Sequence, residues 1–216
     1  MSGKVIAIDG PGGSGKSTVA RQLAEKLDYD YLDTGAMYRA VTWLAIKKNI
    51  DVNDKEGLTD LADSINISFN KKKVFINNKD VTDLIRSPLI DKNVSYVARI
   101  KGVRKRMVIL QREIARKGGI VVDGRDIGSR VLPGADIKVY LTASLEERAQ
   151  RRYNDIKKKD NITLEDVRNE LEKRDRIDKN RDISPLMKTD DASYIDTTDL
   201  SINEVVSKII NLINGE

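Results

Sequence analysis

A glycine-rich turn between an apolar segment and a helical pattern constrains the fold of this chain more than any other feature. The apolar run KVIAIDG predicts a short buried strand that ends at Asp9, and a helical pattern follows the turn through Leu27. The turn itself, GPGGSGKS from Gly10 to Ser17, matches the pattern G-x-x-x-x-G-K-[ST]. A strand, a glycine-rich turn and a helix in this order indicate a phosphate-binding loop at the edge of an α/β sheet.

Each residue type in this loop suits the binding of nucleotide phosphates. Glycines let consecutive backbone N–H groups point inward at phosphate oxygens, and the helix N-terminus adds a favourable field. We expect Lys16 to reach the β- and γ-phosphates of ATP and the Ser17 hydroxyl to hold Mg²⁺. A glycine-rich turn without a ligand is the alternative. The predicted donor-binding residues are Gly10, Pro11, Gly12, Gly13, Ser14, Gly15, Lys16, Ser17 and Thr18.

Four further short apolar segments predict buried strands. They are Tyr31 to Leu32, Ile120 to Val122, Ile137 to Leu141 and Tyr194 to Ile195. Helical patterns separate them, which favours a five-stranded parallel sheet with helices on both faces, a three-layer α/β P-loop fold. The length of 216 residues fits one domain with insertions, so we expect a single domain over 1–216.

The stretch between the second and third predicted strands is longer than one crossover helix needs, and this predicts an insertion. The segments INISF and KVFI flank the polar turn NKKK and favour a small antiparallel β unit near Ile65 to Thr82. A helix from about Lys92 to Arg116 is expected to lead back to the sheet, and a closing helix is expected from Ile202 to Leu212. Capping-box spacing marks helix starts at Ser144, Thr163 and Ser201.

The composition removes several classes of mechanism. The chain has no cysteine and no histidine, which excludes disulfides, thiol nucleophiles, serine–histidine dyads and ordinary zinc sites. Phosphoryl transfer remains well suited because it depends on positioning and charge stabilisation. The net charge of +5 suits an anionic partner, but basic and acidic residues interleave, so we expect small phosphorylated ligands and no nucleic acid. No run is apolar enough for a signal peptide or a membrane span, so we expect a cytoplasmic protein.

Polar motifs follow two of the other predicted strands, at the edge where ligands bind to open α/β sheets. YLDTGAMYR begins at the second strand, and its Tyr38 and Arg39 are candidates for a second anion site. VVDGRDIG ends the third strand and presents Asp123, Arg125 and Asp126. Either motif alone could be a polar strand exit, but both together beside a phosphate-binding loop favour a ligand site.

One predicted helical stripe changes character along its length. On a single face it runs through Leu164, Val167, Leu171, Arg174, Asp178 and Arg181, and its charged half lies in RDRIDKNR. Burial of a leucine-sized side chain contributes about 1.5–3 kcal/mol, whereas an exposed helix pair contributes about 0.3–0.5 kcal/mol. The charged half is therefore either a face that emerges into solvent or a face that binds a ligand, and the neighbouring motifs favour the ligand.

Six motifs, in order along the chain, give a resemblance over nearly its whole length. They are IDGPGGSGKST, YLDTGAMYR, VVDGRDIG, LTASLEERAQRR, RDRIDKNRDISPL and YIDTTDLSINEV. With these motifs the sequence resembles the bacterial cytidylate kinases, a family of nucleoside monophosphate kinases. The resemblance implies transfer of the γ-phosphoryl group of ATP to CMP or dCMP by a monomer. It also implies an acceptor-binding insertion over about 63–99 and a short helical lid over about 151–165.

The resemblance further assigns acceptor-binding residues by their place in the motifs. The cytosine-facing residues would be Thr34, Arg104 and Asp126. A hydroxyl and a carboxylate can accept from the cytosine amino group, and an arginine can donate to the ring acceptors. For Arg104 an exposed basic helix face is the alternative, because RIKGVRKRM offers several arginines.

Other residues would contact the phosphates and the sugar. The acceptor phosphate would be held by Arg39 and Arg125 with Tyr38 nearby, and the sugar side by Arg174, Asp178 and Arg181. Lys16, Arg39 and Arg125 are the predicted catalytic residues, because they would stabilise the charge that spreads during transfer. Asp123 would orient metal-bound water.

The motif LEERAQRR places Arg148 and Arg152 four residues apart on a helix that enters the predicted lid, with Arg151 alongside. The resemblance implies that Arg148 and Arg152 meet the phosphates of ATP. The alternative is pairing of charges four residues apart on an exposed helix.

Two rival functions stay open from the sequence alone. One is a P-loop kinase for another small acceptor, such as a different nucleoside monophosphate or shikimate. The other is a nucleic-acid-binding ATPase, which the net positive charge of the chain would suit. A regulatory GTPase is disfavoured because the chain has no guanine-reading N-K-x-D sequence.

Overall fold

Two compact units make up the structure, a computed structural model that describes residues 3–70, 73–156 and 162–215. The first unit comprises Met1–Leu32 and Lys117–Glu216, and the second comprises Asp33–Arg116. The first unit therefore contains the glycine-rich loop, and the second contains the predicted antiparallel β unit.

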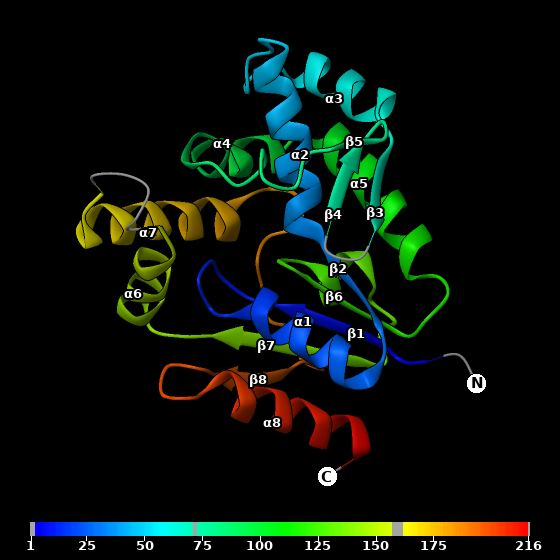
Figure 1. Cartoon of the computed structure of the whole chain (residues 1–216), viewed down its shortest axis with the longest axis vertical. Helices are drawn as coiled ribbons and strands as arrows, with labels where there is room; N and C mark the ends of the chain where they lie inside the picture. Colours follow the sequence, from blue (N-terminus) through cyan, green and yellow to red (C-terminus); the bar gives the residue numbers. More distant parts are fainter. Residues whose placement is uncertain (1–2, 71–72, 157–161, 216) are drawn as a thin grey trace. The chain divides into compact units, whose positions relative to one another are not determined.

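A parallel sheet of five strands forms the centre of the first unit, as the sequence predicted. The strands lie in the order β2-β6-β1-β7-β8 (Figure 1). Their bounds are β1 Val5–Asp9, β2 Asp30–Asp33, β6 Ile120–Gly124, β7 Ile137–Thr142 and β8 Ser193–Asp196. In the central strand β1, Ile8 lies opposite Asp123 of β6 and Val139 of β7.

The α-helices of the first unit begin close to the predicted positions, and a short π-helix, η1, was not predicted. Their bounds are α1 Lys16–Leu27, η1 Ile127–Val131, α6 Leu145–Ile156, α7 Leu164–Asn180 and α8 Ile202–Asn214, of which η1 is a π-helix. Among all the residues that the structure describes, no helix has both the length and the apolar character needed to cross a membrane.

Helical segments cover both faces of this sheet. Ile6 and Ile8 of β1 are fully buried in a core with α1 and α8 on one face. Asp9 points to the opposite face, because successive side chains of a strand alternate. There its carboxylate accepts hydrogen bonds from the backbone of Ile127 and Gly128, where η1 begins. The predicted layering is therefore present within the first unit.

Side-chain caps fix the starts of several helices. Thr163 and Ser201 form complete capping boxes with the residues three positions later, as predicted. At the start of α6 the Glu147 N–H donates to Ser144 Oγ at 3.2 Å, whereas the Glu147 carboxylate accepts from Arg151 Nε. The predicted helix start at Ser144 is therefore confirmed, with Glu147 directed toward Arg151.

The second unit combines four helices with a small antiparallel sheet. Its elements are α2 Thr34–Lys47, α3 Lys55–Ser64, β3 Ile67–Asn70, β4 Lys73–Ile76, β5 Lys79–Asp80, α4 Pro88–Ala98 and α5 Lys101–Ala115. The strands lie in the order β3-β4-β5, which confirms the predicted β unit. Asn77 and Asn78 join β4 to β5 with positive φ angles of 48° and 66°, as in a type I′ turn.

The helix predicted from Lys92 to Arg116 is wrong in one respect, because the structure has two helices there. The break falls at Ile100, whose extended backbone (φ −73°, ψ 123°) begins α5 in a new direction. A Cβ on Gly102 would lie 2.2 Å from the Thr59 side chain, so this glycine lets the first turn of α5 approach α3 closely. Contact between these two helices accompanies the break, and the low helix preference of Gly102 also favours it.

The stripe on α7 is buried over most of its length. Val167 and Leu171 pack with Ala149 of α6, but Leu164 at the first turn is 40% exposed and lies outside this core. Asp178 is only 3% exposed and Arg181 only 9%. The charged half does not emerge into solvent, so that alternative from the sequence is wrong.

Candidate active site

The glycine-rich loop has the backbone geometry of a phosphate-binding loop. Gly10, Gly13 and Gly15 have positive φ angles of 149°, 77° and 84°. A Cβ on Gly10 would lie 1.9 Å from the Leu141 carbonyl oxygen, so only glycine fits there. Helix α1 begins at Lys16 without a side-chain cap, which leaves its N-terminus suited to an anion.

Lys16 lies inside the loop, with only 5% of its surface exposed. Its Nζ donates to the Pro11 carbonyl oxygen at 2.6 Å and to Ser14 Oγ at 3.4 Å. Burial, followed by the nearby Arg125 and Arg174 guanidinium groups, lowers the pKa of Lys16 well below its ordinary value. The Asp123 and Asp9 carboxylates oppose this shift, so Lys16 lies among two arginines and two aspartates.

Oxygen ligands suitable for Mg²⁺ meet at the end of the loop. Ser17 Oγ donates to Asp123 Oδ2 at 2.8 Å, and the Tyr31 hydroxyl donates to Asp123 Oδ1 at 2.9 Å. Mg²⁺ in nucleotide sites takes one or two protein oxygens together with phosphate oxygens. Within the described ranges no cluster of three or more acidic residues could hold a metal ion. The Ser17 and Asp123 oxygens, which lie 2.8 Å apart, fit a site that is shared with phosphate oxygens.

A buried ion network surrounds Asp178 in the first unit. Arg125 Nε donates to Asp178 Oδ2 at 3.0 Å, and Arg181 Nη1 lies 4.0 Å from Asp178 Oδ1. Arg181 Nη2 also donates to Asp126 Oδ1 at 3.4 Å. Burial alone would raise the pKa of Asp178, but Arg125, Arg174 and Arg181 hold it below its ordinary value. The structure thus brings together five predicted site residues, with three arginines for two carboxylates.

A second cluster lies at the start of α2 in the second unit. Arg39 Nε donates to Asp91 Oδ1 at 3.2 Å, and Arg86 Nη2 donates to Asp33 Oδ2 at 2.9 Å. Asp33 also caps α2 by accepting from the Ala36 N–H. Burial would raise the pKa of Asp33, but Arg39 and Arg86 hold it below its ordinary value. The predicted anion-binding Arg39 is therefore anchored beside two carboxylates.

The two predicted cytosine-facing residues of the second unit and Tyr38, predicted to lie near the acceptor phosphate, are also buried. Thr34 is 4% exposed, Tyr38 7% and Arg104 3%. The Arg104 guanidinium lies 5.4 Å from the centre of the Tyr38 ring, and its Nη1 donates to the Ala98 carbonyl oxygen at 3.1 Å. Arg104 therefore does not belong to an exposed basic helix face, which was the alternative from the sequence.

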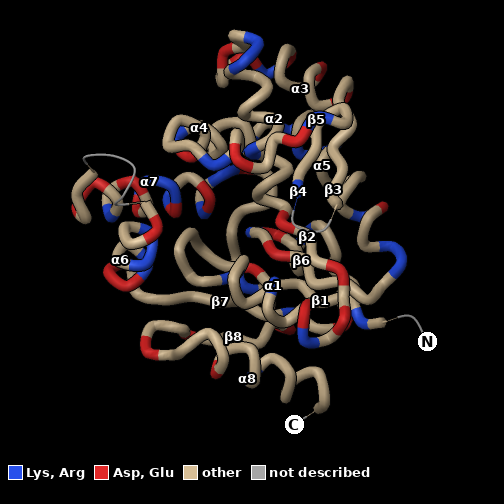
Figure 2. The backbone as a smooth tube through the Cα atoms, viewed as in Figure 1, with Lys and Arg blue, Asp and Glu red and all other residues tan. Residues whose placement is uncertain are grey.

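The arginines of α6 have different surroundings. Figure 2 shows acidic and basic residues interleaved along α6 and α7. Arg148 is buried and bonds to Gly12, Ala143 and Asp175. Arg151 pairs with Glu147 four residues earlier, as the alternative predicted for this helix, and Arg152 is half-buried. The two predicted ATP-contacting arginines are therefore not equivalent.

Sequence reasoning missed several participating residues. Asp9, Tyr31 and Asp175 in the first unit and Arg86 and Asp91 in the second all contact predicted site residues or their neighbours. Asp9 carried a usable signal, because it ends a buried strand directly before the loop. The other partners are 27 to 92 residues distant in sequence, which no local pattern reveals.

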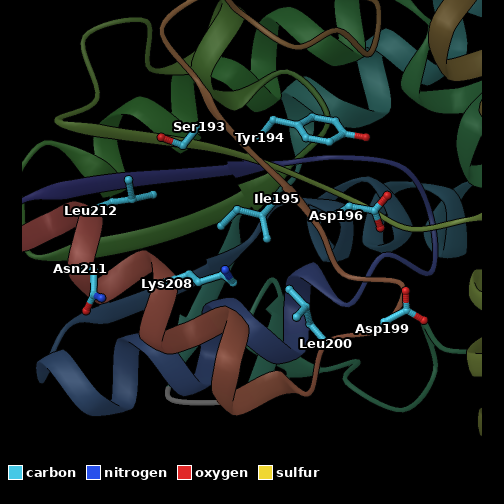
Figure 3. Close-up of a pocket in the computed structure, with 9 residues that line it drawn as sticks. All are labelled: Ser193, Tyr194, Ile195, Asp196, Asp199, Leu200, Lys208, Asn211 and Leu212. Carbon is cyan, nitrogen blue, oxygen red and sulfur yellow. The ribbon is translucent and has the colours of Figure 1, made fainter. Parts of the chain in front are cut away.

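A hollow of about 540 Å³ lies between β8 and α8 of the first unit (Figure 3). It is lined by Ser193, Tyr194, Ile195, Asp196, Asp199, Leu200, Lys208, Asn211 and Leu212. None of the predicted site residues lines it. Its charged residues are two aspartates and one lysine, which gives it no preference for phosphate.

Sequence comparison finds a match over nearly the whole chain. A family model described as cytidylate kinase matches residues 6–215. Proteins named cytidylate kinase from Bacillus cereus (strain B4264) and Bacillus thuringiensis (strain Al Hakam) are each 47% identical to the chain over 215 residues. Each match covers 97% of this chain and 96% of the relative.

Similarity to solved structures is more distant. An uncharacterized protein from Eubacterium ventriosum ATCC 27560 gives a TM-score of 0.56 at 14% identity, and the match covers 99% of both chains. Shikimate kinase from Acinetobacter baumannii in complex with shikimate gives a TM-score of 0.51 at 21% identity, over 99% of this chain and 94% of that one. At such identities the similarity extends to the fold alone.

Proposed function

The chain belongs to the cytidylate kinase family and is a nucleoside monophosphate kinase that transfers the γ-phosphoryl group of ATP to CMP or dCMP, and we propose how its residues divide this work. The glycine-rich loop of the first unit binds the phosphates of ATP. The buried network around Asp178 and the cluster at the start of α2 bind the acceptor nucleotide.

The concentration of buried positive charge around Lys16 carries the donor assignment. Burial lowers the pKa of Lys16 most, and Arg125 and Arg174 lower it further against the Asp123 and Asp9 carboxylates, so three cations stand against two anions. Like charges held together away from water are unfavourable unless an anion joins them. A triphosphate supplies that anion, and the loop from Gly10 to Thr18 supplies backbone N–H groups and a helix N-terminus for it.

Mg²⁺ is proposed to bind beside this loop through Ser17, with Asp123 orienting its water ligands. The support is the 2.8 Å contact between the Ser17 hydroxyl and Asp123 Oδ2, which brings two oxygen donors together. When bound, the ion would neutralise charge on the phosphate oxygens. Tyr31 holds the other carboxylate oxygen of Asp123 in place.

The acceptor is proposed to meet two sets of residues. In the first unit Arg125 binds its phosphate, Asp126 faces the cytosine amino group, and Arg174, Asp178 and Arg181 contact the sugar side. The low pKa of Asp178 supports its role, because an ionised carboxylate is a strong acceptor for sugar hydroxyls.

In the second unit Arg39 is proposed to bind the acceptor phosphate, with Tyr38 nearby, and Thr34 and Arg104 to face the cytosine. The side chains of Thr34, Tyr38 and Arg104 are all buried. This burial favours a shaped binding site for a base and disfavours a solvent-exposed face. The contact of the Arg104 guanidinium with the Tyr38 ring limits the orientations that Arg104 can adopt.

Transfer is proposed to proceed by in-line attack of a CMP phosphate oxygen on the γ-phosphorus of ATP. A bond forms between that oxygen and phosphorus, the bond to the β–γ bridging oxygen breaks, and ADP leaves. Lys16, Arg39 and Arg125 stabilise the negative charge that spreads during transfer. The nucleophile is already an anion, so no side chain is needed as a general base.

Two segments are proposed to exclude water during transfer, an acceptor-binding insertion over about 63–99 and a lid over about 151–165. Exclusion of water matters because water would otherwise compete as an acceptor. Residues 71–72 of the proposed insertion and 157–161 of the proposed lid lie outside the described residues.

Replacement of Lys16 by alanine tests the donor assignment. Lys26→Ala is the matched control, because Lys26 lies on the same helix and is exposed. We expect Lys16→Ala to lose (d)CMP phosphorylation by a factor of about 100 or more while it stays folded, and Lys26→Ala to keep it. Normal turnover by folded Lys16→Ala would contradict the assignment.

A cytoplasmic monomer is also proposed. The large exposed apolar side chains, such as Leu89 and Met187, are spread over both units. Light scattering coupled to gel filtration should give a mass near 24.3 kDa, and a mass twice as large would contradict the proposal.

A further inference from the structure

Arg148 lies inside the first unit, although its position on α6 would suit an arginine that reaches toward a nucleotide. It is 6% exposed, and three protein groups occupy its guanidinium. Nε donates to the Ala143 carbonyl oxygen at 3.0 Å, and Nη1 donates both to the Gly12 carbonyl oxygen at 3.0 Å and to Asp175 Oδ2 at 2.6 Å. Arg148 thus joins α6, α7 and the glycine-rich loop.

The backbone of α6 also touches the loop beside this contact. A Cβ on Gly13 would lie 2.9 Å from both Arg148 Cβ and the Arg148 carbonyl oxygen. A side chain at Gly13 would therefore push α6 away from the loop. The close approach lets Arg148 bind the Gly12 carbonyl, and because the peptide bond is planar and trans, this contact also fixes the direction of the Gly13 N–H on its other side.

Asp175 completes the arrangement from α7. It is 7% exposed, and its second oxygen, Oδ1, is buried without a hydrogen-bond partner among the described residues. A buried carboxylate is unfavourable unless it is paired, so its bond to Arg148 fixes both side chains. The pair is separated by 27 residues in sequence and lies between two packed helices.

A neighbouring arginine makes a second connection to the same loop. Arg151 Nη1 donates to Thr197 Oγ1 at 2.9 Å, and its Nη2 donates to the Thr197 carbonyl oxygen at 2.6 Å. Thr197 Oγ1 has one hydrogen to donate and lies within reach of two carbonyl oxygens, that of Thr142 at 3.0 Å and that of Ser14 at 3.3 Å. The Gly12 carbonyl is therefore held directly from α6, and the Ser14 carbonyl lies beside a threonine that α6 also holds.

We propose that Arg148 and Asp175 are positioning residues for ATP binding. They hold the Gly12 carbonyl outward, so that the N–H groups of the loop stay aimed at the phosphates. Arg148 therefore supports the loop from behind and does not contact the nucleotide itself. This inference rests on the proposed binding of ATP at the loop.

The test uses Arg148→Lys and Asp175→Asn, each of which removes the paired geometry with little change in size. We expect the KM for ATP to rise about tenfold or more in each variant, as for other residues that orient a ligand-binding group. The KM for CMP should stay within about twofold, because the acceptor residues are untouched. Direct titration with a non-hydrolysable ATP analogue should show the same loss of affinity without turnover.

Glu146→Gln with Arg168→Gln is the matched control. Glu146 and Arg168 also join α6 to α7, but Glu146 is exposed, Arg168 is only half-buried, and their charged atoms are 3.8 Å apart. This double variant should keep the wild-type KM for ATP. Thermal unfolding of every variant distinguishes a loss of folding from a loss of ATP affinity. If Asp175→Asn does not fold, the KM of Arg148→Lys for ATP tests the positioning role.

These experiments distinguish a failure of the proposed function from a failure of the positioning role. If the wild-type protein does not phosphorylate CMP or dCMP, the proposed function is wrong. If it does, and folded Arg148→Lys binds ATP and the analogue normally, the positioning role is wrong. Equal rises in both KM values would also overturn it, because they indicate a general structural effect.

Discussion

Replacement of Asp9 by asparagine should change the dependence of stability on pH. Asp9 is 6% exposed at the end of the central strand, and burial is the main cause that raises the pKa of its carboxyl from 3.8 to about 6. The N–H bonds from Gly128 and Ile127 oppose this rise, and the nearby Asp126 carboxylate adds to it. Unfolding would return the group to its ordinary pKa.

The sign follows from proton binding. Between pH 3.8 and about 6 the folded protein keeps a proton on Asp9 that the unfolded chain has released, so stability falls as pH rises through this window. The rise in pKa corresponds to about 3 kcal/mol, of which about 2 kcal/mol should appear between about pH 4 and pH 7. Asparagine at position 9 does not titrate and lacks this change.

Urea unfolding without nucleotides measures the effect. The free energy of unfolding of the wild type minus that of Asp9→Asn should fall by about 2 kcal/mol from about pH 4 to pH 7, because other titrating groups cancel in the difference. Asp190→Asn, at an exposed carboxylate of the same unit, is the control. A difference between wild type and Asp9→Asn that does not vary with pH would refute the assignment of a raised pKa to Asp9.

Three further substitutions test particular contacts. Gly10→Ala should lower the free energy of unfolding by about 3 kcal/mol or more in urea, because its Cβ would meet the Leu141 carbonyl oxygen; wild-type stability would refute the steric argument. Tyr31→Phe removes one hydrogen bond to Asp123 and should raise the Mg²⁺ concentration needed for half-maximal activity by about threefold or more; an unchanged requirement would contradict the role of Tyr31. Arg181→Lys keeps the positive charge but loses the planar guanidinium group. The KM for CMP should therefore rise about tenfold with little change in the KM for ATP. A rise in the KM for ATP with an unchanged KM for CMP would contradict the acceptor role.

Most of the first unit could be predicted because its signals are local. Apolar runs marked all five strands, and the glycine-rich loop fixed the junction of β1 with α1. Capping residues such as Thr163 and Ser201 marked helix starts, because a cap satisfies N–H groups only a few residues away. These interactions depend on neighbours in sequence, so a single chain reveals them.

The errors arose where contacts distant in sequence decide the structure. The break at Ile100 carries no proline, and the glycine that permits contact with α3 comes two residues later. The pairing of Arg148 with Asp175 was missed because Asp175 lies beside the predicted stripe, one residue after Arg174. The motif that assigned Arg148 to ATP carries no signal for the protein groups that hold this arginine in the structure.

Phosphorylation of a panel of acceptors tests the central claim most directly. ADP release should be measured with ATP and CMP, dCMP, UMP, AMP, dTMP or shikimate, and again with RNA or DNA in place of an acceptor. We expect CMP and dCMP to give the highest kcat/KM, with the corresponding nucleoside diphosphate as product. A clear preference for another acceptor, or ATP hydrolysis stimulated by nucleic acid without a nucleoside diphosphate product, would contradict the account.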